Sequence, residues 1–574
     1  MSSSPFGRSL ATGLAVALVT AAGQPALAQA EPPTRFTMDS GHPRTAEQVV
    51  MRFDHAALAI RLTPDTRTIA ATATHRFTAL APLDQLVLEL DRNLAISTVR
   101  IDGAVLSPEF WTNPNGRLAI TLPRPLQPME TVEAEITYAG APHVAENAPW
   151  SGGFVWSETP DGQPWIATAV QGEGCDLFWP CIDHPLGEPA VMDLAITAPP
   201  GLSAVSNGAL MGVETGELGW STWRWRVAQP DTYAIALNVG PYEELAADYH
   251  SRWGNRFPMR FWHLAGDDAG ARGLFAEFPR QLEFYERLIG PYPFADEKMG
   301  VVETPHLGME HQTINAYGNA YAKDANGFDW LLHHELAHEW FGNQMTNADW
   351  RHMWLHEGFA TYMQPLYARE LHGERNFQAG MHDQRVLIAN RFPLVPASHR
   401  TAKEIYDAER GPGLDIYYKG SHVLHTLRLL IGDAAFWAAT RQLVYGRPDP
   451  EPGNFQPRHV TTADFIAAVN ATTGEDMSWF FDAYVFQAAL PDLVTTRAGG
   501  RMTLEWVTGG DAPFPMPLEV EVDGTVRTVA MAGGRGELAV PESAVVVIDP
   551  GSKVLRRSVA IEEFQQWRRD QAAP

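Results

Sequence analysis

Residues 334–338 read His-Glu-Leu-Ala-His, and Glu357 follows nineteen positions after the second histidine. On a helix, two histidines at this spacing lie one turn apart on the same face. Two imidazoles and one carboxylate fill three positions of a tetrahedral zinc ion and leave the fourth open, as a catalytic site requires. The pattern therefore predicts a zinc site made by His334, His338 and Glu357.

The residues around this motif have the apolar spacing of two buried helices. Apolar side chains recur every three or four residues around the histidines and again after Trp354, which places Glu357 in the first turn of a second helix. Gly342-Asn343 provides a stop signal between the two. Pro365 is expected to kink the second helix beyond the ligand. The alternative, two core histidines satisfied by hydrogen bonds, does not account for this combined spacing.

Length and composition describe a multidomain globular protein. A chain of 574 residues is too long for one core and predicts about three domains, and its 45% hydrophobic and 19% charged residues are ordinary values. The net charge of −25 argues against nucleic acid or an anionic membrane surface as a partner. It carries no information about the reaction, because an acidic surface commonly serves solubility alone.

Residues 1–30 have the pattern of an export signal. Arg8 precedes an apolar run over 10–22, and the segment closes on Ala-Leu-Ala-Gln-Ala at 26–30, which resembles a signal cleavage site. The run is short for a membrane span, although an uncleaved anchor is the alternative. We expect a periplasmic or secreted protein without stable membrane insertion after cleavage.

The chain has two cysteines, Cys175 and Cys181, six positions apart. In an exported protein they can bridge a tight loop, and they can equally fill core space as thiols. The spacing leaves both possibilities open.

Three regions of different periodicity follow one another. Short β-branched runs separated by turn residues over about 45–245 predict an all-β domain of sandwich or saddle type. After about 246 the pattern is helical, and from about 496 it returns to strands, with a hairpin at Asp523-Gly524 and a short helix over 558–570. The fold class is therefore multidomain α+β. Besides the two helices of the zinc motif, helices are expected over 274–289, 418–431, 433–445 and 462–487.

A catalytic zinc site also needs a general base. Zinc activates water, and a nearby group must take the proton of that water and pass it to the leaving group. Glu335 lies between the two histidines and projects toward the metal without being needed as a ligand. We therefore assign the base to Glu335.

Several motifs resemble those of one family. Residues 334–343, His-Glu-Leu-Ala-His-Glu-Trp-Phe-Gly-Asn, resemble the zinc helix of the gluzincin metallopeptidases that include aminopeptidase N and leukotriene hydrolase. Residues 354–362, Trp-Leu-His-Glu-Gly-Phe-Ala-Thr-Tyr, are similar to the helix of that family's third ligand. Residues 307–311, Leu-Gly-Met-Glu-His, are similar to its G-A-M-E-N exopeptidase motif, and 417–420, Tyr-Tyr-Lys-Gly, fit its Y-x-K-G. Upstream, 171–174 resemble its Q-x-[QE] segment and 178–185 its F-P-C-F-D-E-P.

With the periodicity, the resemblance implies an N-terminal β domain over 31–245, a thermolysin-like and mainly α catalytic domain over 246–492, and a small C-terminal β domain with a polar tail over 493–574. It implies a zinc-dependent aminopeptidase with one zinc ion per chain, which hydrolyses the first peptide bond of peptides with a free N-terminus.

The resemblance also assigns roles to individual residues. Glu310 and Glu173 are expected to bind the substrate α-ammonium, with Gln171, Gly308 and Met309 completing the substrate site. The alternative for Glu173 is a loop carboxylate that faces water. Tyr417 is expected to donate a hydrogen bond to the developing oxyanion, with Tyr418 as the alternative donor.

Four departures from the family pattern bear on these roles. His311 replaces the Asn of the exopeptidase motif, Leu307 replaces its first Gly, and Glu339 replaces a Gln, either beside the metal ligands or facing solvent. The long helical C-terminal domain of many relatives is absent, which predicts a more open site.

Lipid epoxide hydrolysis, endopeptidase activity and a catalytically inactive scaffold are the competing hypotheses. The preferred N-terminal residue, the physiological substrate and the oligomeric state are not fixed by the sequence.

Overall fold

Strands β1 (Met51–Thr63) and β2 (Thr68–Ala79) alternate buried and exposed side chains, so each presents one apolar face to a core. In the computed structural model, which describes residues 37–453, 455–510 and 512–572, they lie at the centre of an eight-stranded sheet. The export signal predicted over 1–30 lies outside the described residues. The order of the sheet is β13 (Ala209–Thr215), β14 (Ser221–Ala228), β11 (Val191–Ala198), β1, β2, β8 (Thr131–Gly140), β4 (Leu94–Ile101) and β5 (Ala104–Val105).

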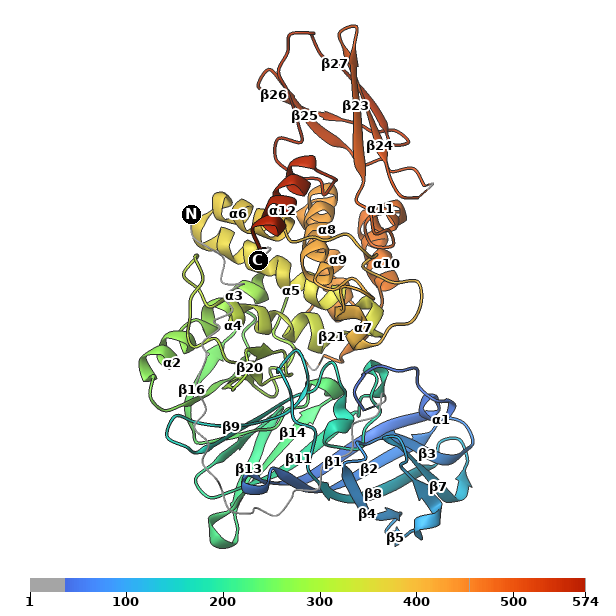
Figure 1. Ribbon diagram of the computed structural model, residues 1–574, viewed down its shortest axis with the longest axis vertical. Coiled ribbons are helices and arrows are strands. Elements are labelled where there is room, and N and C mark those ends of the chain that lie inside the picture. The colour runs from blue at the N-terminus through green and yellow to red at the C-terminus, as the bar shows by residue number, and fades with distance from the viewer. Residues whose placement is uncertain (1–36, 454, 511, 573–574) are drawn as a thin grey trace. The chain divides into compact units, whose positions relative to one another are not determined.

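Two smaller sheets complete this β region, which is blue to green in Figure 1. One orders β12 (Ser203–Val205), β15 (Asn238–Gly240), β10 (Pro164–Ala169) and β9 (Gly153–Glu158), and the other β3 (Leu83–Glu89), β7 (Arg117–Leu126) and β6 (Trp111–Thr112). Their inward side chains form one buried apolar cluster. The short helix α1 (Ala46–Val49) precedes β1.

A five-stranded sheet introduces the helical region. Its order is β16 (Tyr242–His250), β17 (Arg256–Leu264), β18 (Met299–Glu303), β20 (Asn315–Tyr317) and β19 (Gly308–Met309). The single helix predicted over 274–289 is wrong in detail. The segment forms α2 (Asp268–Phe275) and α3 (Phe278–Leu288), because Pro279 suits only the first turn of a new helix.

The helices that carry the zinc motif are α4 (Trp330–Ala337) and α5 (Trp354–His372), and α5 continues through Pro365. Helix α8 (Asp415–Ile431) packs directly on α5: a Cβ at Gly358 would lie 3.1 Å from the backbone of Gly420. The segment predicted as one helix over 462–487 divides after Gly474, which caps the first half in the left-handed conformation. The remaining elements here are α6 (Glu374–Arg385), α7 (Ala402–Tyr406), α9 (Asp433–Tyr445), α10 (Thr462–Thr473), α11 (Ser478–Tyr484), β21 (Met345–Asn347) and β22 (Arg458–Val460).

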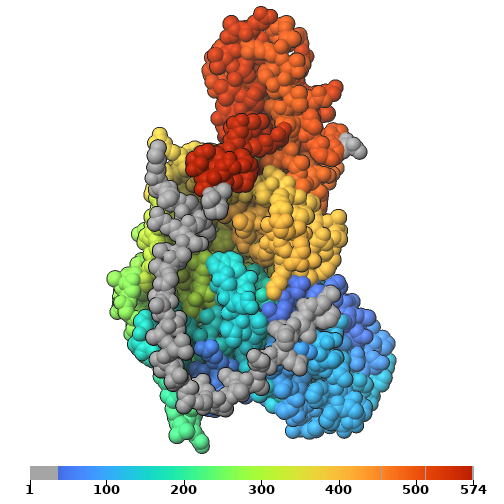
Figure 2. Space-filling model, viewed as in Figure 1, coloured from blue at the N-terminus to red at the C-terminus, as the bar shows by residue number. Residues whose placement is uncertain are grey.

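The C-terminal region returns to strands, as predicted. One sheet orders β23 (Asp492–Ala498), β24 (Arg501–Val507) and β27 (Arg535–Ala539), and the other β26 (Thr525–Val529), β25 (Leu518–Val522) and β28 (Val546–Ile548). The hairpin at Asp523-Gly524 is confirmed, with both turn residues at positive φ. Figure 2 shows helix α12 (Val559–Ala572), dark red, on the surface. Among the described residues, no helix is both long and apolar enough to cross a membrane.

Candidate metal centre and substrate site

Helix α4 brings the two histidines of the motif together. Asp329 caps the helix by accepting hydrogen bonds from the backbone amides of Leu331 and Leu332, both at 3.0 Å. The Nε2 atoms of His334 and His338 lie 3.3 Å apart, and Oε2 of Glu357, from α5, lies 3.5 Å from each. Three acceptor atoms thus converge on one point from two packed helices.

These three atoms fit a zinc ion. Bonds of ~2.0–2.1 Å at tetrahedral angles separate neighbouring ligand atoms by about 3.3–3.4 Å, close to the separations in the triad. Glu357 is buried, and its Oε2 accepts no hydrogen bond from any residue that the structure describes. A buried carboxylate oxygen without a partner is costly unless a cation satisfies it. The donor set and its geometry therefore suit a divalent cation.

Neighbouring groups fix the orientation of two of the ligands. Nδ1 of His338 lies 2.9 Å from the carbonyl oxygen of Phe341. Donation of the Nδ1 proton to that carbonyl leaves the Nε2 lone pair for a metal. Oε1 of Glu357 accepts a hydrogen bond of 2.8 Å from the hydroxyl of Tyr406 on α7, which directs Oε2 toward the histidines.

Glu335 lies beside the triad and is buried. Burial, followed by the charge of Glu310, raises the pKa of Glu335 well above its usual value, an effect that a bound cation would oppose. Gly308 covers its carboxylate: a Cβ at that position would lie 2.5 Å from Oε1 of Glu335. The glycine of the exopeptidase motif therefore provides room for this carboxylate, and Met309 beside it is buried in β19.

Tyr417 lies beside the triad. Its ring lies 6.2 Å from that of His334, nearly parallel to it. Burial, followed by the charge of Glu357, raises the pKa of Tyr417 well above its usual value, so the hydroxyl remains protonated and can donate a hydrogen bond. Lys419 anchors the same turn of α8 by donating to the carbonyl oxygens of Gln487 and Ala488, at 3.0 and 2.8 Å. The pKa of Tyr418 is raised by burial alone.

Glu310 is held by two donors from the β region. Nε2 of Gln171 donates to its Oε1 at 2.7 Å, and the hydroxyl of Tyr233 donates to the same oxygen at 3.0 Å. Glu310, Glu335 and His338 each have one ligand atom within 4.8 Å of those of the other two. The carboxylate of Glu310 therefore lies beside the base candidate and one of the metal ligands.

Glu173 has a different environment from Glu310. It is fully buried, which rules out the alternative of a loop carboxylate facing water. Its Oε1 lies 2.9 Å from Nζ of Lys403 on α7, and its Oε2 accepts from the backbone amide of Gly152. The charge of Glu173 is thus already balanced by a residue of the chain.

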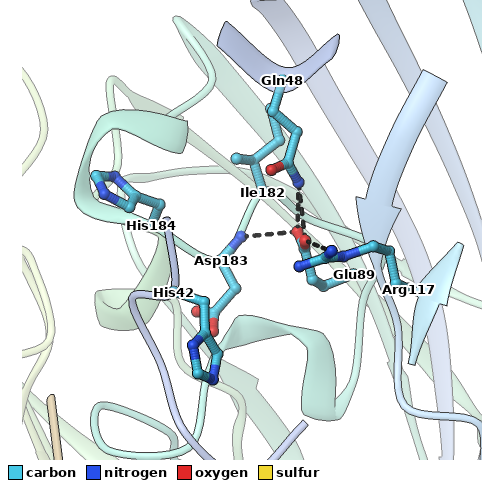
Figure 3. Close-up of a pocket in the computed structure, with 7 residues that line it drawn as sticks. All are labelled: His42, Gln48, Glu89, Arg117, Ile182, Asp183 and His184. Carbon is cyan, nitrogen blue, oxygen red and sulfur yellow. Dashed lines mark hydrogen bonds and ion pairs between the residues drawn. The ribbon is translucent and has the colours of Figure 1, made fainter. Parts of the chain in front are cut away.

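The loop that contains Gln171 and Glu173 is fixed by the segment that follows it in the chain. Cys175 and Cys181 form a disulfide, with Cα atoms 6.3 Å apart, so the bridged alternative is the one observed. Figure 3 shows how the segment beyond it is fixed: Gln48 and the backbone amide of Asp183 both point at the carboxylate of Glu89, at 2.8 and 3.2 Å. The small cavity in this view lies beside the segment that fixes the loop with Gln171 and Glu173.

Two of the residues that depart from the family pattern, Glu339 and His311, are buried, and Leu307 is half-buried. Glu339 accepts from the hydroxyl of Tyr292 at 3.1 Å and from the amide of Thr313 at 2.9 Å, and burial raises its pKa to about 8. It touches no metal ligand in these contacts and does not face solvent. His311 has no hydrogen-bond partner for either ring nitrogen in the described part of the chain, and burial lowers its pKa to about 3.

Three side chains at the site were not anticipated from the sequence: Tyr233, Lys403 and Tyr406. Tyr233 lies in a stretch that looks like a strand, whereas Thr232–Ala234 form a 3-10 turn. Lys403 and Tyr406 lie in α7, whose only local signal is the Thr401/Glu404 capping box. Nothing in a single sequence connects that signal with Glu173, 230 positions upstream of Lys403, or with Glu357, 49 positions upstream of Tyr406.

Comparison with known proteins agrees with this geometry. Residues 282–484 match the Peptidase family M1 domain. A solved M1 zinc metallopeptidase mutant from Deinococcus radiodurans, bound to a Tyr-Ser-Ala substrate, is 28% identical, covers 79% of this chain and 98% of its own, and superposes with a TM-score of 0.66.

Two curated relatives are more distant. Leucine aminopeptidase 2 of Aspergillus niger is 26% identical over 65% of this chain and 60% of its own length. Tricorn protease-interacting factor F2 of Thermoplasma volcanium is 23% identical over 64% of this chain and 47% of its own length. This chain thus spans about half the length of these relatives. Residues 282–484 thus carry a peptidase family M1 domain, and most of the chain shares its fold with a solved M1 metallopeptidase.

Proposed function

We propose that this protein is a zinc-dependent aminopeptidase. One observation carries the proposal: a buried carboxylate, Glu310, is fixed by Gln171 and Tyr233 within 4.8 Å of Glu335 and His338. A carboxylate in that place attracts a substrate ammonium to the immediate neighbourhood of the metal position. The solved M1 metallopeptidases bound to L-tryptophan and L-arginine, each 28% identical to this chain, support an amino-acid-sized subsite.

Each residue of the site has a separate role in peptide-bond hydrolysis. Zinc held by His334, His338 and Glu357 would activate the attacking water and polarise the scissile carbonyl. Glu335 accepts a proton from that water and delivers it to the nitrogen of the leaving peptide. Tyr417 donates a hydrogen bond to the carbonyl oxygen as that oxygen gains negative charge.

The position of Glu310 also explains restriction to the first peptide bond. The α-ammonium of a substrate is separated from the first carbonyl carbon by one Cα atom. Because the Glu310 carboxylate lies within 4.8 Å of the ligand atoms of Glu335 and His338, it can bind that ammonium when the first carbonyl is at the metal position. An internal bond presents a neutral amide there, so the buried charge of Glu310 gains no cationic partner, which disfavours binding of an internal bond.

This function can be tested with pairs of peptides that differ only in whether the N-terminus is free or acetylated. A panel of aminoacyl fluorogenic compounds and short peptides is expected to be hydrolysed when the N-terminus is free and to resist cleavage when it is acetylated. The ratio of kcat/KM for the two forms is the measurement. Cleavage of acetylated peptides at internal bonds would contradict the proposal and favour an endopeptidase.

The two acidic candidates for the ammonium site are expected to differ. Glu310→Gln is expected to raise KM about 10- to 100-fold, the equivalent of ~1.5–3 kcal/mol for a hydrogen bond to a charged group. Glu173→Gln is expected to raise KM less, because Lys403 already balances that carboxylate. Steady-state kinetics on one free-amine substrate compares them. Equal increases in KM would mean that the two residues hold the ammonium jointly, and a larger increase for Glu173→Gln would reverse their ranking.

The proposal also covers the export of the protein and the division of its chain into domains. The pattern of residues 1–30 supports a protein delivered to the periplasm or secreted, and the Cys175–Cys181 disulfide suits such a compartment. We also propose domains over 31–245, 246–492 and 493–574, with free-amine peptides as partners and no nucleic acid.

A further inference from the structure

Helix α7 ends on a tyrosine that contacts a metal ligand. The hydroxyl of Tyr406 donates to Oε1 of Glu357 at 2.8 Å. The other oxygen of Glu357 is the one that lies 3.5 Å from Nε2 of both His334 and His338. The two oxygens of this carboxylate thus have separate partners, one in the protein and one at the metal position.

The backbone that carries Tyr406 is fixed at both ends. At its start, the Thr401 hydroxyl accepts from the amide of Glu404, and the Glu404 carboxylate accepts from the amide of Thr401. The amide of Ala402 donates to the carbonyl oxygen of Ser40 at 3.0 Å. At its end, the backbone amide of Asp407 donates to the carbonyl oxygen of Lys403 at 3.0 Å, which closes the last turn. Tyr406 therefore presents its hydroxyl from a rigid support.

A carboxylate ligand without such a support can rotate about its last side-chain bond. Rotation replaces the oxygen that faces the histidines and costs ordering free energy when a metal binds. A hydrogen bond to the other oxygen removes this freedom, and loss of such supporting contacts commonly weakens metal affinity about 10- to 100-fold. Tyr417 is the second tyrosine here, with its ring 6.4 Å from that of Tyr406, and its hydroxyl is assigned to the substrate.

We propose that Tyr406 is a positioning residue that fixes Glu357 with Oε2 facing His334 and His338, and so sets the affinity of this site for its metal. The proposal rests on the zinc-dependent function proposed above. Tyr406 is assigned no contact with substrate or with the reacting atoms, so its effect is on metal retention rather than on the chemical step.

Zinc affinity of the full chain tests this assignment, measured by competition with a chromophoric chelator. Tyr406→Phe keeps the ring and removes only the hydroxyl. We expect its Kd for zinc to rise about 10- to 100-fold, with kcat at saturating zinc within a few-fold of the wild-type value. Tyr418→Phe, which removes the hydroxyl of a tyrosine whose pKa is shifted by burial alone and not by Glu357, is the matched control, with unchanged zinc affinity.

Two further readouts separate positioning from a general loss of structure. The metal-free Tyr406→Phe protein is expected to unfold at the same temperature as the metal-free wild type. With Co²⁺ in place of zinc, its visible absorption spectrum is expected to change, because the carboxylate ligand is reoriented. Wild-type zinc affinity in Tyr406→Phe would overturn the assignment. Failure of the wild-type protein itself to bind zinc would instead overturn the proposed function.

Discussion

Replacement of Glu335 by Gln is expected to lower kcat by about 10²- to 10⁴-fold, the range that general-base catalysis contributes. The amide has the shape of the carboxylate but cannot accept the proton of the attacking water. Glu335 is buried beside the triad and is not one of the three converging ligands, so the variant should retain its metal. Turnover of a free-amine substrate and zinc content of the same preparation are the two measurements.

Glu339→Gln is the matched control for this variant. Glu339 is another buried glutamate one turn further along, but it accepts from Tyr292 and Thr313 and contacts no metal ligand through these bonds. We expect its kcat to stay within a few-fold of the wild-type value. Near-normal turnover in Glu335→Gln would show that another group takes the proton.

Replacement of Tyr417 by Phe is the second large expected effect. Loss of one donor to a developing oxyanion costs ~3 kcal/mol, or roughly 10²- to 10³-fold in kcat. KM should change little, because the hydrogen bond strengthens mainly in the transition state. The raised pKa of Tyr417 keeps the donor protonated at neutral pH. Steady-state kinetics over a range of substrate concentrations separates the two constants.

Tyr418→Phe accompanies this variant as its control. The ring of Tyr418 lies 6.3 Å from that of Tyr417, whereas Tyr417 alone stacks near His334. Tyr418→Phe is therefore expected to leave kcat nearly unchanged. A large loss in Tyr418→Phe with none in Tyr417→Phe would transfer the role to Tyr418.

The parts of the site that follow a local pattern were predictable. The spacing of His334, His338 and Glu357 reflects one helical turn and one packed helix pair, so periodicity was enough to bring them together. The hairpin at Asp523-Gly524 depends only on two residues that accept positive φ. The resemblance to a family placed Glu310 and Tyr417 near the metal without explaining what holds them there.

The parts that depend on long-range packing were not predictable. The pairing of Glu173 with Lys403 joins residues 230 positions apart, and the contact of Tyr406 with Glu357 joins residues 49 positions apart. Neither Lys403 nor Tyr406 lies in a sequence pattern that marks it as functional. Helix ends were also missed where one residue decides them, as with Pro279 in the first turn of α3.

The zinc content of the purified protein, measured by elemental analysis before and after dialysis against a chelator, is the sharpest test of a catalytic zinc site. We expect one zinc ion per chain, loss of aminopeptidase activity with the metal, and recovery when zinc is returned. Protein that hydrolyses free-amine peptides without zinc, or that keeps its full rate after the metal is removed, would contradict this expectation.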